Sequence, residues 1–263
     1  MSLVVSDIST HGIVMVGDSA VTRRKNGNVV EVSSDCSKIH YSKAANIGFA
    51  IWGRSNLPNQ RLDSWLREFV NSKVHPGDSL EDVGQLLAKS LNEQIEAMKE
   101  PWDKQVRGIH LAGYRDDKPV LFHVHCGHPN EPPHELRLYH DYPDDQNWSI
   151  EEFEKLLSLG VIHLRNGFIQ HFAALFDSMR TYMARLDHVL GVKLPQPSLQ
   201  GRFDFYKLLV RFVADTLTVT GQTQSVNEKL SAIAFDRRGL QIDGRLDVVP
   251  KEAKDSTDLA AYF

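Results

Sequence analysis

The sequence has few cysteines, no long hydrophobic run and no excess of basic residues. Two cysteines in 263 residues, Cys36 and Cys126, are too few for a disulfide framework of the secreted type. No stretch approaches the roughly 18 consecutive apolar residues that a membrane-spanning helix needs. The formal net charge is −4, which provides no general positive field for nucleic acid. These absences exclude a disulfide-rich, a membrane-spanning and a broadly nucleic-acid-binding protein.

The sequence also lacks the signals of secretion, of cofactor binding and of metal binding. No basic segment followed by an apolar core marks a secretory signal, and a cytoplasmic protein is therefore predicted. The glycines form no phosphate-binding pattern, so no cofactor is expected. The run His123, His125, Cys126 and His128 fits no standard zinc spacing, and no metal site is predicted from it.

Hydrophobic periodicity predicts an α+β protein in which strands and helices are segregated along the chain. We find no repeat and no linker, so a single domain is expected over residues 1–263. Two antiparallel sheets, with helices covering both outer faces, would accommodate the order of the elements. Strands are predicted at residues 2–8, 12–18, 29–32, 38–41, 46–52, 106–114, 119–124, 230–235 and 240–242, and helices at 62–70, 79–98, 149–159, 162–189 and 205–217.

Three segments carry no clear periodicity. The basic stretch Arg23-Arg24-Lys25 is interpreted as a surface loop. Residues 127–147 are Pro-rich, acidic and aperiodic, which predicts an irregular insertion. The C-terminal tail, about 244–263, is charged and weakly patterned.

The N-terminal eighteen residues carry the chemistry. Ser2 follows an initiator Met, which is usually removed before a residue this small. The α-amine of Ser2, with a reference pKa near ~8, could then act as general base for the hydroxyl of the same residue. A buried Lys38 ammonium nearby would favour the deprotonated hydroxyl and amine. Asp18 would hold that ammonium by a charge-assisted hydrogen bond, and the Gly53 N–H is the candidate oxyanion donor.

Residues 2–56 resemble the β-type subunits of the proteasome and the bacterial HslV-type peptidase, which are N-terminal nucleophile (Ntn) hydrolases. In that family an N-terminal Thr, sometimes Ser, opens a strand, and an Asp follows sixteen residues later. Asp18 follows Ser2 by the same sixteen residues (18 − 2). Gly12-Ile-Val-Met-Val-Gly-Asp18-Ser19 matches the family's second strand, and Lys38-Ile39 and Ile51-Trp52-Gly53 match two later positions.

The resemblance implies a four-layer αββα sandwich and amide hydrolysis through a seryl acyl-enzyme. It implies Ser2, Asp18, Lys38 and Gly53 as the catalytic residues, with no metal and no cofactor. It further implies a homo-oligomeric ring that takes peptide or unfolded-protein substrates. An ATP-dependent unfoldase would be the partner that delivers them.

The sequence departs from the family pattern at the supporting positions. Asp18-Ser19-Ala20 replaces the family's Asp-x-Arg, and Leu164-Arg165-Asn166-Gly167 is a loose counterpart of its Gly-Ser-Gly segment. Ser225 is the candidate substitute for a missing later serine. Two alternatives therefore stay open: a non-catalytic ring subunit or scaffold, in which Asp18 and Lys38 form only a structural ion pair, and an acylase for small amides.

Overall fold

The structure is a computed structural model. It describes residues 3–25, 28–33, 35–53, 57, 59–96, 107–126, 136–142, 149–159, 162–167, 169–190, 198–219, 226 and 229–245. The strands are β1 (Leu3–Ser9), β2 (Gly12–Asp18), β3 (Val21–Lys25), β4 (Asn28–Ser33), β5 (Ile39–Ser42), β6 (Ile47–Gly53), β7 (Arg107–Arg115), β8 (Lys118–Cys126), β9 (Leu136–Tyr142), β10 (Ile162–Gly167), β11 (Leu230–Asp236) and β12 (Gly239–Gly244). The helices are α1 (Leu62–Lys73), α2 (Leu80–Glu96), α3 (Ile150–Leu159), α4 (Ile169–Leu190) and α5 (Leu199–Val219).

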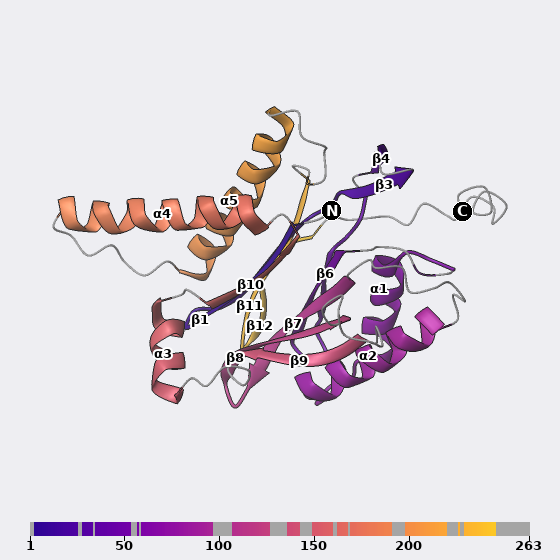
Figure 1. The fold of residues 1–263 in the computed structure, drawn as a ribbon. Coiled ribbons are helices and arrows are strands. Elements are labelled where there is room, and N and C mark those ends of the chain that lie inside the picture. The colour runs from indigo at the N-terminus through magenta and orange to yellow at the C-terminus, as the bar shows by residue number, and fades with distance from the viewer. Residues whose placement is uncertain are drawn as a thin grey trace.

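Two five-stranded antiparallel sheets form the centre of the molecule (Figure 1). The first sheet has the strand order β10-β1-β2-β11-β12, and the second sheet has the order β5-β6-β7-β8-β9. Strands β3 and β4 form a separate two-stranded ribbon. The described chain is therefore α+β with two antiparallel sheets, as the segregated periodicity predicts.

The two sheets pack against each other through a layer of apolar side chains. Alternate residues of each strand point into this layer, such as Val4 and Ile13 from the first sheet and Ala50 and Leu121 from the second. A Cβ atom at Gly48 would collide with Met15 and Phe235, so the missing side chain allows the sheets to approach closely.

Helices cover the outer face of each sheet. Helices α1 and α2 bury an apolar stripe, for example Leu66 and Leu87, against the second sheet. Helices α4 and α5 do the same for the first sheet, with Phe172 and Val210 fully buried. Ser79 is the N-cap of α2, because the Asp82 N–H donates to the Ser79 hydroxyl oxygen at 3.1 Å. Among the described residues, no helix is both long enough and apolar enough to cross a membrane.

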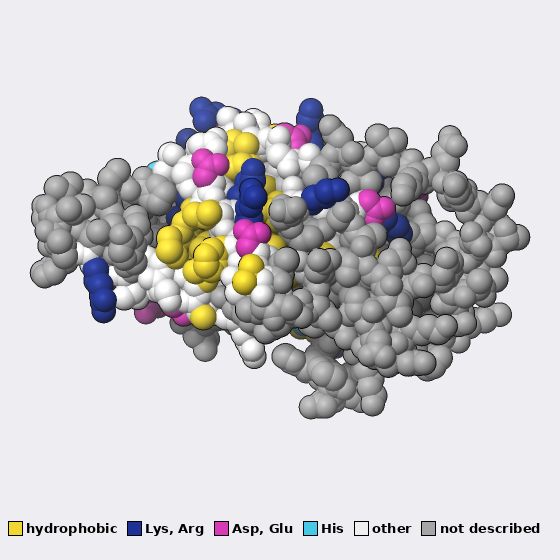
Figure 2. Space-filling view, turned by 90° about the horizontal axis from the view of Figure 1, so that it is seen from above, with side chains coloured by type: hydrophobic (Ala, Val, Ile, Leu, Met, Phe, Trp, Pro, Cys, Tyr) yellow, Lys and Arg dark blue, Asp and Glu magenta, His cyan; other side chains and the backbone are white. Residues whose placement is uncertain are grey.

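The outer face of α5 keeps large apolar side chains in contact with solvent. Leu208 and Phe212 are 56% and 54% exposed, and they lie four residues apart on one side of the helix. Figure 2 shows hydrophobic side chains gathered on the upper face, over the side of the molecule that α4 and α5 occupy. Apolar side chains grouped in this way form a surface suited to contact with another apolar surface.

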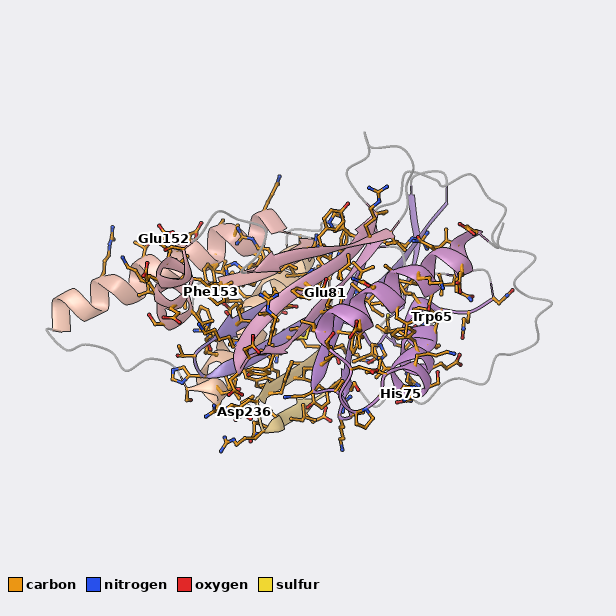
Figure 3. All side chains as sticks on the ribbon, turned by 90° about the horizontal axis from the view of Figure 1, so that it is seen from below. Trp65, His75, Glu81, Glu152, Phe153 and Asp236 are labelled. Atoms are coloured by element: carbon orange, nitrogen blue, oxygen red, sulfur yellow. The ribbon has the colours of Figure 1, made fainter. Side chains whose placement is uncertain are left out.

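Helix α3 closes one end of the layer between the sheets. Phe153 is buried there with Leu157, whereas Glu152 is exposed. Trp65 of α1 lies towards the other end of the molecule, on the opposite side from Phe153 (Figure 3). The short helix predicted at residues 149–159 is confirmed.

The two strands predicted at residues 2–8 and 12–18 are confirmed, and they form a hairpin with its turn at Thr10 and His11. Its register pairs Val4 with Gly17 and Ser9 with Gly12. Gly12 has a φ of +134°, and an added Cβ would lie 2.6 Å from the Phe235 carbonyl oxygen. Both observations require glycine at this position.

The prediction of a surface loop at Arg23-Arg24-Lys25 is wrong. These residues end β3, which pairs antiparallel with β4. The two strands are separated in sequence by Asn26-Gly27, a dipeptide typical of two-residue hairpin turns. That signal was available in the sequence, but the run of positive charge obscured it.

The prediction of an irregular segment at residues 127–147 is also wrong in part, because β9 lies within it. Leu136 and Leu138 alternate with polar residues and pack with the second-sheet core. The Asn92 side chain accepts from the Leu136 N–H and donates to the Leu136 carbonyl, both at 2.9 Å. Pairing with β8 therefore decides the conformation of this segment. Most of the C-terminal tail, residues 246–263, lies outside the described residues.

A long helix predicted at residues 162–189 begins later, because residues 162–167 form β10. Ile162 and Leu164 alternate with polar residues and pack into the layer between the sheets. Strand β10 pairs antiparallel with β1 along its length. Only two apolar residues carry the alternation of β10 before the apolar stripe of α4 begins, so periodicity alone merged a strand with a helix.

Candidate functional site

Asp18 and Lys38 form a buried ion pair at the end of β2. The Lys38 Nζ donates to Asp18 Oδ1 at 2.8 Å. The side chains are 4% exposed for Lys38 and 0% exposed for Asp18. Two residues that are twenty positions apart in sequence are thus brought together, as the sequence predicts. A buried ion pair by itself is compatible with a structural role as well as a chemical one.

The Asp18 carboxylate also binds the beginning of β1. Its Oδ1 accepts a hydrogen bond from the Leu3 N–H at 2.7 Å, and its Oδ2 accepts one from the Ala20 N–H at 2.9 Å. The Leu3 nitrogen is the atom that forms the peptide bond with Ser2. Ser2 itself, the predicted nucleophile, lies outside the described residues.

Gly53 ends β6, the strand next to Lys38. The Lys38 carbonyl accepts from the Ile51 N–H at 2.9 Å, so the chain around Lys38 runs alongside the last residues of β6. Gly53 has a φ of +81° and is exposed, a backbone conformation that favours glycine. The backbone at Lys38 is thus bonded to β6 two residues before Gly53.

Strand β10 reaches the same end of the first sheet. Gly167 pairs with Leu3, and Asn166 pairs with Val4. The segment 164–167, which the sequence suggested only as a loose counterpart of a supporting element, is thus the strand beside β1. Its placement was missed because residues 162–167 were predicted as helix. The candidate substitute Ser225 lies outside the described residues.

Solved structures with the same arrangement were found by comparison of the fold. A Gly-1 mutant of Anbu from Hyphomicrobium sp. strain MC1 matches with a TM-score of 0.54 and 12% identity, covering 100% of this chain and 92% of that chain. Anbu in a helical assembly from Pseudomonas aeruginosa matches with a TM-score of 0.54 and 13% identity, covering 99% and 90%. Anbu, described as an ancestral beta-subunit, from Yersinia bercovieri matches with a TM-score of 0.50 and 15% identity, covering 89% and 81%.

The fold is proteasome-like. No protein-family model and no curated protein matches the sequence. Identities of 11–15% show a shared fold and do not by themselves carry an activity to this chain. In this fold, the Asp18–Lys38 pair lies at the start of β1, and β6 runs beside Lys38 at Ile51.

Neither cysteine is a candidate nucleophile at this site. Both thiols are free and buried. Cys36 lies close to the ion pair, and its N–H donates to the Ser19 carbonyl at 3.3 Å. Burial, reinforced by the charge of Asp63, raises the pKa of the Cys36 thiol to about 12, so the thiol stays protonated and unreactive at neutral pH.

The histidines of the second sheet form a cluster between the two sheets of the proteasome-like fold. The Trp52 Nε1–H donates to His123 Nε2 at 2.7 Å, and His125 stacks on Tyr139. Within the described residues, no group of three or more potential metal ligands is present, and His128 lies outside them. The sequence singled out these histidines as a motif but gave no role to them.

Proposed function

We propose that the chain is an N-terminal nucleophile amidohydrolase that cleaves peptide bonds with Ser2. The observation that supports this best is the set of contacts made by Asp18. One carboxylate oxygen accepts from both Lys38 Nζ and the Leu3 N–H. The Leu3 nitrogen is bonded directly to Ser2. The hydrogen bond from the Leu3 N–H to Asp18 therefore fixes the backbone position next to Ser2. The proposal requires removal of Met1, which turns the Ser2 nitrogen from an amide into an amine.

The Ser2 hydroxyl attacks the substrate carbonyl carbon and gives its proton to the Ser2 α-amine. The tetrahedral intermediate then collapses, the carbon–nitrogen bond breaks, and the leaving amine takes the proton from the α-ammonium. Water attacks the resulting seryl ester by the same route in reverse, and the acid product leaves. The Lys38 ammonium, held by Asp18, favours the deprotonated forms of the hydroxyl and the amine throughout.

The backbone N–H of Gly53 is proposed as the donor to the oxyanion of that intermediate. Its place at the exposed end of β6 supports this role, because no side chain at residue 53 can obstruct the substrate. Loss of one such donor typically raises the barrier by about 3 kcal/mol.

We infer that the layers form the four-layer αββα sandwich of the proteasome-like family, in one domain over residues 1–263. The apolar clusters between the sheets and under each helix pair support this order of layers. Peptides or unfolded proteins are the proposed substrates, and an ATP-dependent unfoldase in the cytoplasm is the proposed partner. Neither a metal nor a cofactor enters the proposed chemistry.

We also propose that copies of this chain assemble through the exposed face of α5. In an antiparallel pair of α5 helices with a two-fold axis between Lys207 and Leu208, Arg211 of each copy lies opposite Asp204 of the other. Leu208 of each copy then lies beside Leu208 of the other. Asp204, Leu208, Arg211 and Phe212 are exposed on one side of the helix, and the face is complementary to itself in charge and apolar content. The Anbu structure from Pseudomonas aeruginosa is titled a helical assembly, which supports self-association of this fold.

The proposed activity is tested by the mass of the protein from its native host and by covalent labelling. Loss of one Met residue is expected. A peptide epoxyketone, which reacts with a hydroxyl and an amine of the same residue, should label the parent and Ser72→Ala but not Ser2→Ala. Ser72 is an exposed serine on α1 and serves as the matched control. Retention of Met1, or labelling that survives Ser2→Ala, would contradict the proposal and favour the non-catalytic scaffold.

The substrate class is tested separately. Hydrolysis of short peptides by the labelled protein supports a peptidase. If the protein hydrolyses only small acylated amines, it is an acylase with the same nucleophile and not a peptidase.

A further inference from the structure

Several polar side chains are buried between the two sheets, behind the proposed site, and the role inferred for them rests on the proposed function. Such groups are rare in an apolar layer, because each one requires a hydrogen-bond partner. Ser6, His110, His123 and Trp52 lie in this layer and are 0–8% exposed. Their contacts connect the strands that carry the site.

The first contact joins β1, β7 and β10. His110 Nε2 lies 2.6 Å from Asn166 Oδ1, and His110 Nδ1 lies 2.9 Å from the Ser6 Oγ. An amide oxygen only accepts, so Nε2 carries the proton and Nδ1 accepts from the Ser6 hydroxyl. One imidazole therefore holds β1, four residues after Ser2, in register with the strand whose end pairs with Leu3.

The second contact joins β6 and β8. An indole N–H only donates, so His123 Nε2 must be the unprotonated nitrogen that accepts from Trp52. Trp52 directly precedes Gly53, the proposed oxyanion donor. Gly108 on the intervening strand makes room for this bond, because an added Cβ would lie 2.7 Å from Trp52 Nε1 and 2.8 Å from His123 Nε2.

The two contacts are themselves adjacent. His110 and His123 are register partners on β7 and β8, with ring centroids 4.9 Å apart and the rings perpendicular. His125 is the other titratable group near them, and it stacks on Tyr139. The pair thus links the nucleophile strand β1 to the end of β6 at Gly53 across the two sheets.

We propose that His110 and His123 are positioning residues that fix the start of β1 relative to Gly53 at the end of β6. Neither touches the proposed reacting atoms. Their effect on the reaction comes from the distance between Ser2 and the oxyanion donor, and small errors in that distance lower the rate of the chemical step more than the binding of substrate.

Three variants test the role of His123. His123→Leu removes the acceptor for Trp52, whereas His123→Gln supplies a side-chain carbonyl that can accept the same bond. Gly108→Ala keeps both side chains and forces them apart. Val124→Ala is the matched control: Val124 lies on the same strand and is buried, but it faces α1 and α2.

We expect His123→Leu and Gly108→Ala to lower kcat for peptide hydrolysis by at least about ten-fold with KM changed by less than about two-fold. His123→Gln should restore most of kcat. The indole N–H resonance of Trp52, assigned with Trp52→Phe, should shift in His123→Leu and Gly108→Ala but not in Val124→Ala. The control should lose thermal stability while it keeps kcat.

Two results would overturn the positioning role. If His123→Leu shifts the indole resonance and keeps full kcat, the role falls while the proposed function stands. If the parent protein is neither labelled at Ser2 nor active, the proposed function and the positioning role fall together.

Discussion

Asp18 is the residue on which the candidate site depends. Its carboxylate accepts from a lysine side chain and from two backbone N–H groups, at 2.7–2.9 Å. A carboxylate with this many donors is stable in a buried place because its partners replace the lost hydration. The same contacts fix where Lys38 and the start of β1 lie. A structural ion pair and a catalytic pair differ in how the activity responds to the removal of both charges.

The first prediction separates those two roles. Lys38→Met alone leaves a buried carboxylate without its cation, and we expect it to lower the free energy of unfolding by about 3–5 kcal/mol. Asp18→Asn combined with Lys38→Met should recover most of that loss. Labelling by the epoxyketone should stay at least about a hundred-fold slower than in the parent for both variants.

Urea unfolding and labelling rates measure the two effects. A double variant that regains full labelling along with its stability would show that the pair has no part in the chemistry.

The second prediction concerns buried histidines and pH. Burial lowers the pKa of His40 and of His110 to about 4 and that of His123 well below its usual value. In the unfolded chain these groups titrate near 6.5. Above pH 6.5 they are neutral in both states, so the folded state keeps its full stability. As pH falls from 6.5 to 4, the unfolded state takes up protons first, and each group lowers the stability by up to about 1.4 kcal/mol per pH unit.

Urea unfolding at several pH values measures the slope with which the free energy of unfolding falls as pH drops from 6.5 to 4. His123→Gln should reduce the slope by the share of one histidine, whereas Gln85→Ala, an exposed change of an uncharged side chain on α2, should leave it unaltered. An unchanged slope in His123→Gln would mean that His123 has the same pKa in both states.

At the scale of elements, β9 shows how a strand depends on a contact from another element. Asn92, on α2, pairs with both backbone groups of Leu136 and thereby replaces a strand neighbour at the edge of the second sheet. Removal of that side chain leaves the Leu136 N–H and carbonyl to form hydrogen bonds with water instead.

The third prediction concerns this contact. Asn92→Ala should lower the stability by about 1–2 kcal/mol and speed amide exchange in β9, first at Leu136. Exchange in the central strand β7 should not change. Gln85→Ala, an exposed change on the same helix, is the control. Equal acceleration in β7 and β9 would show that the sheet opens only as a whole.

At the scale of the whole molecule, the exposed face of α5 is the feature that a single copy does not explain. Leu208 and Phe212 lie in the middle of the helix, with Asp204 and Arg211 beside them. Apolar surface of this kind is favourable only when it is buried, and the order of charges fits an antiparallel copy of the same helix.

The fourth prediction uses the reciprocity of such an interface. Asp204→Arg and Arg211→Asp should each weaken self-association by at least about ten-fold, because like charges then face each other twice. The double variant should restore it, since the exchanged charges pair again. Sedimentation measures the association.

Leu208→Glu should give a monomer that keeps its thermal unfolding profile. A double charge variant that stays dissociated would argue for a different partner on this face.

Much of this protein is determined by local sequence. Gly12 allows the tight turn at Thr10 and His11, and the turn fixes the register that pairs Val4 with Gly17 and brings the Leu3 N–H to the Asp18 carboxylate. The pairing of Lys38 with Asp18 agrees with the resemblance to the family pattern at those two positions. The amphipathic stripes of α1, α2 and α5 were likewise predictable, because each helix buries one face through residues close in sequence.

The tertiary structure decided the rest. Strands β9 and β10 are short alternating segments, and their conformation depends on β8 and β1, which are separate elements of the chain. The contacts of His110 and His123 depend on two sheets meeting face to face. A local pattern sets which side of an element is apolar, but only the packing of elements decides which polar groups are enclosed together and must therefore bind one another.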